Sequence, residues 1–134
     1  MRASVRRVVL VILLCPVFAL AVFAEGWEHL GKVDRVEQKK DGVELIAGKA
    51  RVSITFFREG IVRVRVAPGG TFAKDRSWAV IEAPEPPAVT VRDSKEEVRV
   101  AGGGVLVHIN KSPLLIRFSD AKGNSFAADE PTMP

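Results

Sequence analysis

The chain has 134 residues, with 20 basic and 16 acidic side chains and a formal net charge of +4. Residues 1–24 carry three of the basic side chains and no acid, so residues 25–134 have 17 basic and 16 acidic side chains, a balance of +1. A nearly neutral domain exerts no broad attraction on phosphate backbones, and this argues against nucleic acid as a partner.

The first 24 residues have the pattern of a secretory signal peptide. A basic start precedes an uncharged run and a small residue: Arg2, Arg6 and Arg7, then Val8–Phe23, then Ala24. The run is shorter than the roughly 20 apolar residues that a membrane helix needs, and Pro16 interrupts it. We therefore expect cleavage after Ala24, no stable membrane span afterwards, and export to the periplasm or the extracellular space. The only cysteine, Cys15, belongs to this run, so residues 25–134 form no disulfide and no thiolate metal site.

Alternating apolar and polar residues predict short strands throughout residues 25–134, because alternation with period two places one set of side chains on a core face. The clearest case is Arg51–Pro68, which turns at Glu59-Gly60 and predicts an antiparallel hairpin. Its second strand would turn three valines inward, namely Val62, Val64 and Val66.

In chain order, strands are predicted at Lys32–Lys39, Val43–Ala47, Lys49–Phe57, Ile61–Ala67, Ser77–Ala83, Val89–Val91, Val98–Val100, Val105–Asn110 and Leu114–Ser119, with another from Phe126. Turn residues separate them: Asp41-Gly42, Pro68-Gly69-Gly70, Pro84–Pro87, Ser94-Lys95, Gly102–Gly104 and Asp120–Gly123. Lys32–Lys39 is the weakest of these segments, and about eight or nine short strands at regular spacing predict an all-β fold, either an antiparallel β-sandwich or a barrel.

Five sequence segments follow one another in an order and at a spacing that are typical of one protein family: Gly60–Pro68, Ser77–Val80, Val105–Asn110 followed by Pro113, Phe118–Gly123 and Ala128–Glu130. Together they resemble the amino-terminal β-sandwich of glycoside hydrolase family 31, the α-glucosidase and α-xylosidase family. The resemblance spans roughly residues 49–130. It implies a galactose-mutarotase-like supersandwich, incomplete here, that occupies residues 25–134 after a signal peptide at 1–24.

The family resemblance also implies where the chemistry lies. In that family the sandwich precedes a (β/α)₈ barrel, which supplies the two aspartates of a retaining mechanism and uses no cofactor. A barrel needs about 250 residues, and no barrel motif occurs in this chain. We therefore assign no catalytic, cofactor-binding or metal residue to any position. The chain is expected to be a non-catalytic fragment whose partner is the downstream barrel of an enzyme acting on α-linked oligosaccharides.

The residues themselves offer only weak candidates for a catalytic or metal site. A retaining glycosidase needs two carboxyl groups about 5 Å apart, whereas neighbours on an extended chain, such as Asp129 and Glu130, point to opposite sides. His29 and His108 are far apart in sequence and have no carboxylate at ligand spacing, so no metal site is predicted.

Other charged side chains have a structural interpretation. Arg63 and Arg65 would lie on an outer face, solvated or paired with acids of a following domain. Three acids near strand ends are expected to be solvated: Asp93, Glu96 and Glu97.

The alternative hypothesis is a free-standing carbohydrate-binding or adhesive β-sandwich. Such a protein needs exposed aromatic rings on which a sugar can stack, and the two tryptophans, Trp27 and Trp78, are the candidates. Trp78 lies in an apolar predicted strand and Trp27 lies close to the cleavage site, so the sequence favours a structural role for both.

Overall fold

The computed structural model describes residues 30–75 and 84–129. The expected signal peptide, its cleavage site and the strand predicted at Ser77–Ala83 lie outside these residues. The described residues form nine strands and no helix, and none of their segments could cross a membrane as an apolar helix.

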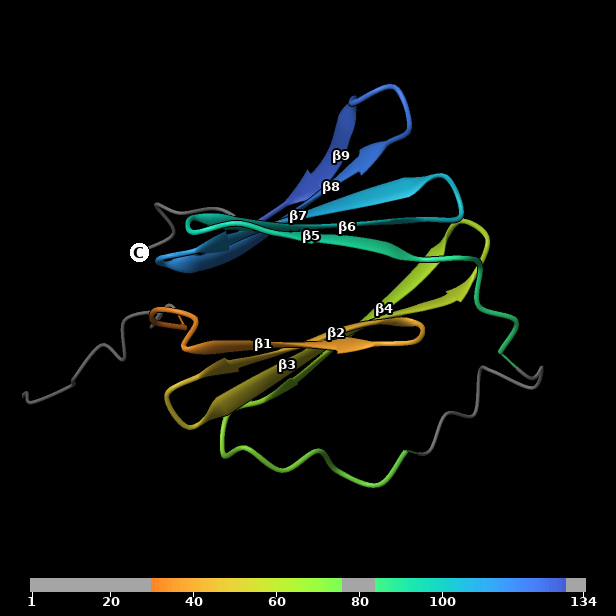
Figure 1. Cartoon of the computed structure of the whole chain (residues 1–134). Coiled ribbons are helices and arrows are strands. Elements are labelled where there is room, and N and C mark those ends of the chain that lie inside the picture. Colours follow the sequence, from red (N-terminus) through yellow and green to blue (C-terminus); the bar gives the residue numbers. More distant parts are fainter. Residues whose placement is uncertain (1–29, 76–83, 130–134) are drawn as a thin grey trace, which may run out of the picture.

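The nine strands form two antiparallel sheets stacked as two layers (Figure 1). The four-stranded sheet has the order β1-β2-β3-β4, and the five-stranded sheet has the order β5-β6-β7-β8-β9. Their bounds are β1 Arg35–Lys39, β2 Gly42–Ala47, β3 Ala50–Arg58, β4 Ile61–Ala67, β5 Thr90–Asp93, β6 Glu97–Gly102, β7 Val105–Lys111, β8 Leu114–Asp120 and β9 Ser125–Ala128. Every pairing joins neighbours in sequence. The all-β prediction is confirmed, and of the two expected architectures the sandwich is the one observed.

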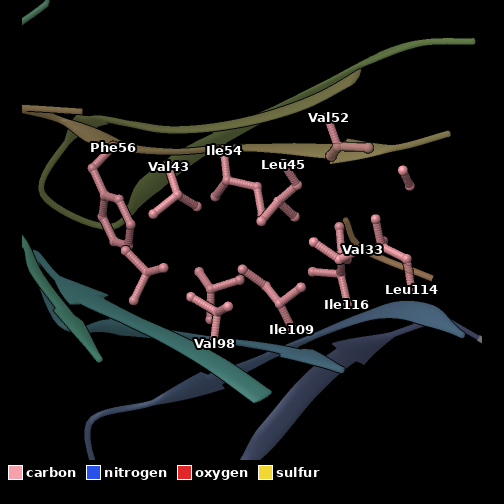
Figure 2. Packing of buried hydrophobic residues seen from close by; sticks show 13 residues of the cluster. Val33, Val43, Leu45, Val52, Ile54, Phe56, Val98, Ile109, Leu114 and Ile116 are labelled. Carbon is pink, nitrogen blue, oxygen red and sulfur yellow. The ribbon is translucent and has the colours of Figure 1, made fainter. Parts of the chain in front are cut away.

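The core lies between the two sheets because the alternation in each strand turns its apolar residues toward the other layer. Figure 2 shows Leu45 and Ile54 of the four-stranded sheet facing Ile109 and Val98 of the five-stranded sheet. All four side chains are fully buried. Phe56 is the largest of the fully buried side chains and fills one end of this layer.

The two layers are joined by hydrogen bonds at both ends. At one end, the backbone N–H of Gly60 in the β3–β4 turn donates to the carbonyl of Gly103 in the β6–β7 turn at 2.8 Å. Both glycines have positive φ, and a Cβ on Gly103 would lie 2.9 Å from the Cα of Glu59, so this approach requires glycine. At the other end, Val33 donates to the carbonyl of Lys111 at 2.8 Å.

Strand β4 departs from the fully covered sandwich that alternation alone suggests. Val62, Val64 and Val66 share the inner face of their sheet, as predicted. They lie directly opposite three buried residues of β3, namely Phe56, Ile54 and Val52. Nevertheless Val64 is 38% exposed and Val66 is 51% exposed, because the described residues of the second sheet do not extend over this edge strand. We call this uncovered inner face of β4, together with Phe118 and Phe126 of the opposite layer, the open side.

Candidate functional site

The outer face of the five-stranded sheet carries a chain of three polar side chains from neighbouring strands. His108 of β7 lies between Glu97 of β6, at 2.9 Å from Nδ1 to Oε1, and Ser119 of β8, at 3.3 Å from Nε2 to Oγ. The order acid, imidazole and hydroxyl is the order that serine hydrolases use. Ser119, however, is only 1% exposed, so its hydroxyl cannot reach a substrate. The three groups therefore form a structural network in this sheet.

Glu97 is consequently more than the solvated strand end that the sequence suggested. Burial raises the pKa of its carboxyl group, but hydrogen bonds from His108 and Arg99 outweigh burial, and the net result is a pKa below the ordinary value. The guanidinium of Arg99 donates to Glu97 at 2.7 Å. Each charged hydrogen bond of this kind stabilises the carboxylate form and hence the folded state in which it exists.

We expect Glu97→Gln to lower the free energy of unfolding by roughly 1 kcal/mol at pH 7 and by progressively less in acid. A carboxyl group whose pKa is depressed by folding stabilises the protein above its unfolded-chain pKa of about 4.3, and this stabilisation is lost as the pH falls through the folded-state pKa. Urea denaturation of both proteins between pH 7 and pH 3 measures the difference. Glu96→Gln, at an exposed neighbouring position, is the control. A gap between Glu97→Gln and the wild type that stayed constant with pH would contradict this account.

The outer face of β4 holds the loop at residues 71–75. Arg63 makes a bidentate pair with Asp75, both N–O distances being 2.7 Å, and this pairing holds the pKa of the Asp75 carboxyl below its ordinary value. Arg65 donates to the carbonyl of Ala73, and its guanidinium lies 5.0 Å from the ring centroid of Phe72. Both arginines point outward as predicted. However, they contact a loop of the same chain, and this leaves neither guanidinium fully available to the acids of another domain.

The remaining acids proposed as candidates do not come together. Asp129 is hydrogen-bonded to β8, because its Oδ2 accepts a hydrogen bond from the N–H of Ile116 at 2.8 Å. Its neighbour Glu130 lies outside the described residues. Asp93 pairs with Lys111. Within residues 30–75 and 84–129, no group of three histidine, cysteine or acidic side chains could hold a metal ion.

A hollow of about 230 Å³ lies at the open side. Its lining residues have apolar side chains or none, and polar backbone atoms also face it: Gly60, Val62, Val105, Phe118 and Phe126. An apolar cavity of roughly 150 Å³ can bind benzene, so this hollow has room for one aromatic side chain of another polypeptide segment. A sugar is usually held by several polar side chains as well as by the backbone, and no polar side chain lines the hollow.

The aromatic platform of the alternative hypothesis rests on residues that are not described. Trp27 and Trp78 both lie outside the described residues, as does His29. Among the described aromatic rings, Phe126 is the exposed one, at 63%, and it packs against Phe118 with ring centroids 6.3 Å apart. The structural role that the sequence favours for the two tryptophans and the alternative of sugar stacking therefore both stay predictions.

Comparison with known proteins identifies relatives of this sandwich. The family model of the glycosyl hydrolase 31 N-terminal galactose mutarotase-like domain matches residues 51–133. Alpha-glucosidase 2 of Bacillus thermoamyloliquefaciens is 33% identical over 78 residues, which cover 58% of this chain and 10% of that protein.

Two solved structures share the fold. A glycoside hydrolase family 31 dextranase from Flavobacterium johnsoniae, complexed with glucose, superposes with a TM-score of 0.68 at 19% identity over 78% of this chain. A cycloalternan-forming enzyme from Listeria monocytogenes, in complex with a pentasaccharide substrate, superposes with a TM-score of 0.61 at 21% identity, also over 78% of this chain. This chain covers 13% of the dextranase and 10% of the Listeria enzyme, so it spans about a tenth of the length of each relative.

Proposed function

This chain belongs to the glycosyl hydrolase 31 N-terminal galactose mutarotase-like domain family, and on that premise we propose that it is the non-catalytic amino-terminal domain of an exported α-glucosidase- or α-xylosidase-like enzyme. In this role the sandwich buttresses a catalytic barrel and helps to shape the substrate entrance, and the barrel hydrolyses α-linked oligosaccharides. The proposal includes removal of residues 1–24 during export, which mass spectrometry of the exported protein would test by finding Glu25 at its amino terminus.

The observation that carries the proposal is the open side. Val64 and Val66 occupy inner-face positions in register with the core, yet they are 38% and 51% exposed. Contiguous exposed apolar groups on a sheet edge mark a surface that another segment covers. The hollow beside them is lined by apolar side chains and backbone and has room for one aromatic side chain, as expected for a contact between two parts of one protein.

The size of the relatives supports the same role. The matching segment makes up about a tenth of the α-glucosidase, the dextranase and the cycloalternan-forming enzyme. About nine-tenths of each relative therefore lies outside the matching segment. Glycoside hydrolysis needs two carboxyl groups at a defined separation. In this sandwich the carboxyl groups of Glu97 and Asp129 are engaged in structural hydrogen bonds.

A chimeric enzyme tests the proposal. The 78-residue segment of the Bacillus α-glucosidase that matches this chain is replaced by the corresponding residues of this chain, and hydrolysis of an α-linked glucoside is measured. We expect the chimera to be active, and Val64→Glu with Val66→Glu to lower the yield of soluble, active chimera about tenfold, because two carboxylates would be buried without partners. Ala121→Glu, in an exposed turn, is the matched control and should have no effect.

Two outcomes would contradict the buttressing role. A chimera that retained full activity with glutamate at positions 64 and 66 would show that the open side is not covered in the enzyme. A folded chimera that bound substrate but did not hydrolyse it would show that this sandwich cannot support the barrel of a family 31 enzyme.

A further inference from the structure

Four basic or titratable side chains form a line across the outer face of the five-stranded sheet. The register places Arg92 of β5 opposite Arg99 of β6, Arg99 opposite His108 of β7, and His108 opposite Arg117 of β8. We call these four residues the cationic row. The apolar residues next to them in sequence belong to the core or pack against it, so the row faces away from the core, and all three arginines are exposed.

The cationic row is unfavourable for the stability of the sheet. Side chains directly opposite each other have Cβ atoms about 4.5–5.5 Å apart, and like charges at this distance, here those of Arg92 and Arg99, destabilise the pairing. One acid, Glu97, compensates the row by contacting Arg99 and His108. In the described part of the chain, the guanidinium groups of Arg92 and Arg117 make no ion pair and no hydrogen bond. The ends of the row are therefore free to bind an anion.

The other sheet of the same molecule shows the ordinary arrangement. On the outer face of the four-stranded sheet, each basic side chain has an acid within reach: Arg35 and Lys39 pair with Glu37, and Lys39 and Arg51 pair with Glu44. The register also places Glu37 directly opposite Glu44, but three basic side chains pair with these two acids, so charges of both signs are interspersed on this face. The two sheets therefore differ in whether their like charges are compensated, because in the described residues Arg92 and Arg117 have no acid partner.

We propose that the cationic row is a binding site for an acidic polysaccharide whose carboxylate groups lie across the strands. Adjacent strands are about 4.8 Å apart, so the four positions extend over about 14 Å and can contact several consecutive charges of an extended chain. Guanidinium groups bind carboxylates through two parallel hydrogen bonds, which suits arginine at the exposed positions. The site is separate from the open side and does not depend on the enzyme that the sandwich supports.

The chemistry of the row argues against two other occupants. Protein interfaces are anchored by tryptophan, tyrosine and arginine in well-packed pockets. The described strands β5–β8 turn no phenylalanine, tyrosine or tryptophan ring to this face, and its leucines, Leu106 and Leu115, are half-buried, so the arginines have no apolar or aromatic anchors beside them. A single-stranded nucleic acid needs aromatic rings on which bases stack, and the described strands β5–β8 turn no phenylalanine or tryptophan to this face. A carboxylated polysaccharide requires neither.

The test measures binding of polygalacturonate to the purified protein at low and at moderate salt, with dextran and a single-stranded oligonucleotide as alternative ligands. We expect polygalacturonate to bind at low salt, to be released as salt screens the charges, and to lose about tenfold in affinity in the double variant Arg92→Gln, Arg117→Gln. The matched control is Arg35→Gln with Arg51→Gln on the other sheet, which should change the affinity less than twofold. Melting curves establish that each variant is folded.

A charge reversal separates binding from a purely structural role. Arg92→Glu places an acid directly opposite Arg99, so this variant should melt at a higher temperature than the wild type while it binds polygalacturonate more weakly. Four outcomes would overturn the proposal: no binding of polygalacturonate at low salt, equal losses in the two double variants, binding of dextran as tight as that of polygalacturonate, or tighter binding of the oligonucleotide. Because none of these measurements involves a glycosidase activity, their failure leaves the buttressing role unaffected.

Discussion

Replacing Phe56 by alanine is expected to lower the free energy of unfolding by about 3–5 kcal/mol, a large fraction of the roughly 5–15 kcal/mol by which small domains are stable. Phe56 is 1% exposed and is the largest fully buried side chain in the described residues. Its ring lies against Gly102, where a Cβ would be 3.1 Å from Cδ1 of the ring. The β6–β7 hairpin thus approaches this ring closely, and the alanine variant would leave a cavity that neither sheet can close without losing that approach.

Urea denaturation followed by circular dichroism measures this loss as a lower midpoint at an unchanged slope. Phe126→Ala removes the same ring from a position that is 63% exposed and should cost less than about 1 kcal/mol. Equal losses in the two variants would mean that the layer around Phe56 is not the core of the protein.

The substitution Gly42→Ala is expected to destabilise the four-stranded sheet by about 3 kcal/mol, although it adds a single methyl group. A Cβ at position 42 would lie 1.9 Å from the carbonyl oxygen of Ile54 and 2.9 Å from the carbonyl carbon. Gly42 begins β2 opposite Thr55, so the clash can be relieved only by separating β2 from β3. That separation would displace Val43 and Ile54, which are both in the core.

Gly69→Ala is the control for this variant, because a Cβ at position 69 meets no atom within 4 Å and the backbone there does not have positive φ. It should leave the thermal midpoint within a few degrees of the wild type, since a surface substitution changes stability by roughly 0.5 kcal/mol or less. A Gly42→Ala protein with a wild-type midpoint would show that the β2–β3 pairing is able to shift at this point.

The three faces of this sandwich differ in the contacts that they can make. The open side is apolar and concave, so it suits a protein segment. The loop at residues 71–75 lies against the outer face of β4, where Asp75 pairs with Arg63. The cationic row is exposed and carries positive charge, so it suits an anion. A domain that joins a larger enzyme through the first of these faces would still present the third to solvent or to a polymer.

The alternation of residues 51–68 was sufficient to predict the strands and the turn between them. The predicted strand Ile61–Ala67 coincides with β4, and the predicted turn at Glu59-Gly60 is observed, with positive φ at Gly60.

Short turns also determine the register of the strands that they join. The turns at Gly103-Gly104 and near Pro113 place positions 99 and 117 opposite His108. The cationic row could therefore have been found from the sequence by pairing strands outward from each turn.

The contact between Glu97 and His108 could not be found in this way. The two residues are neither direct cross-strand partners nor adjacent in sequence, since Glu97 lies opposite Asn110 and His108 opposite Arg99. Their 2.9 Å hydrogen bond depends on the diagonal approach of two side chains, which the twist of the sheet and the rotamers decide.

By itself, the sequence determined the class of the fold, the positions of the described strands and the face of each strand that carries apolar residues, because period-two alternation is a local property of the chain. Only the tertiary structure decided that Val64 and Val66 remain uncovered while Val52 and Ile54, on the same face, are fully buried. The pattern of the four residues is the same. What differs is whether the second sheet extends over the strand, and this depends on how two layers remote in sequence overlap in space.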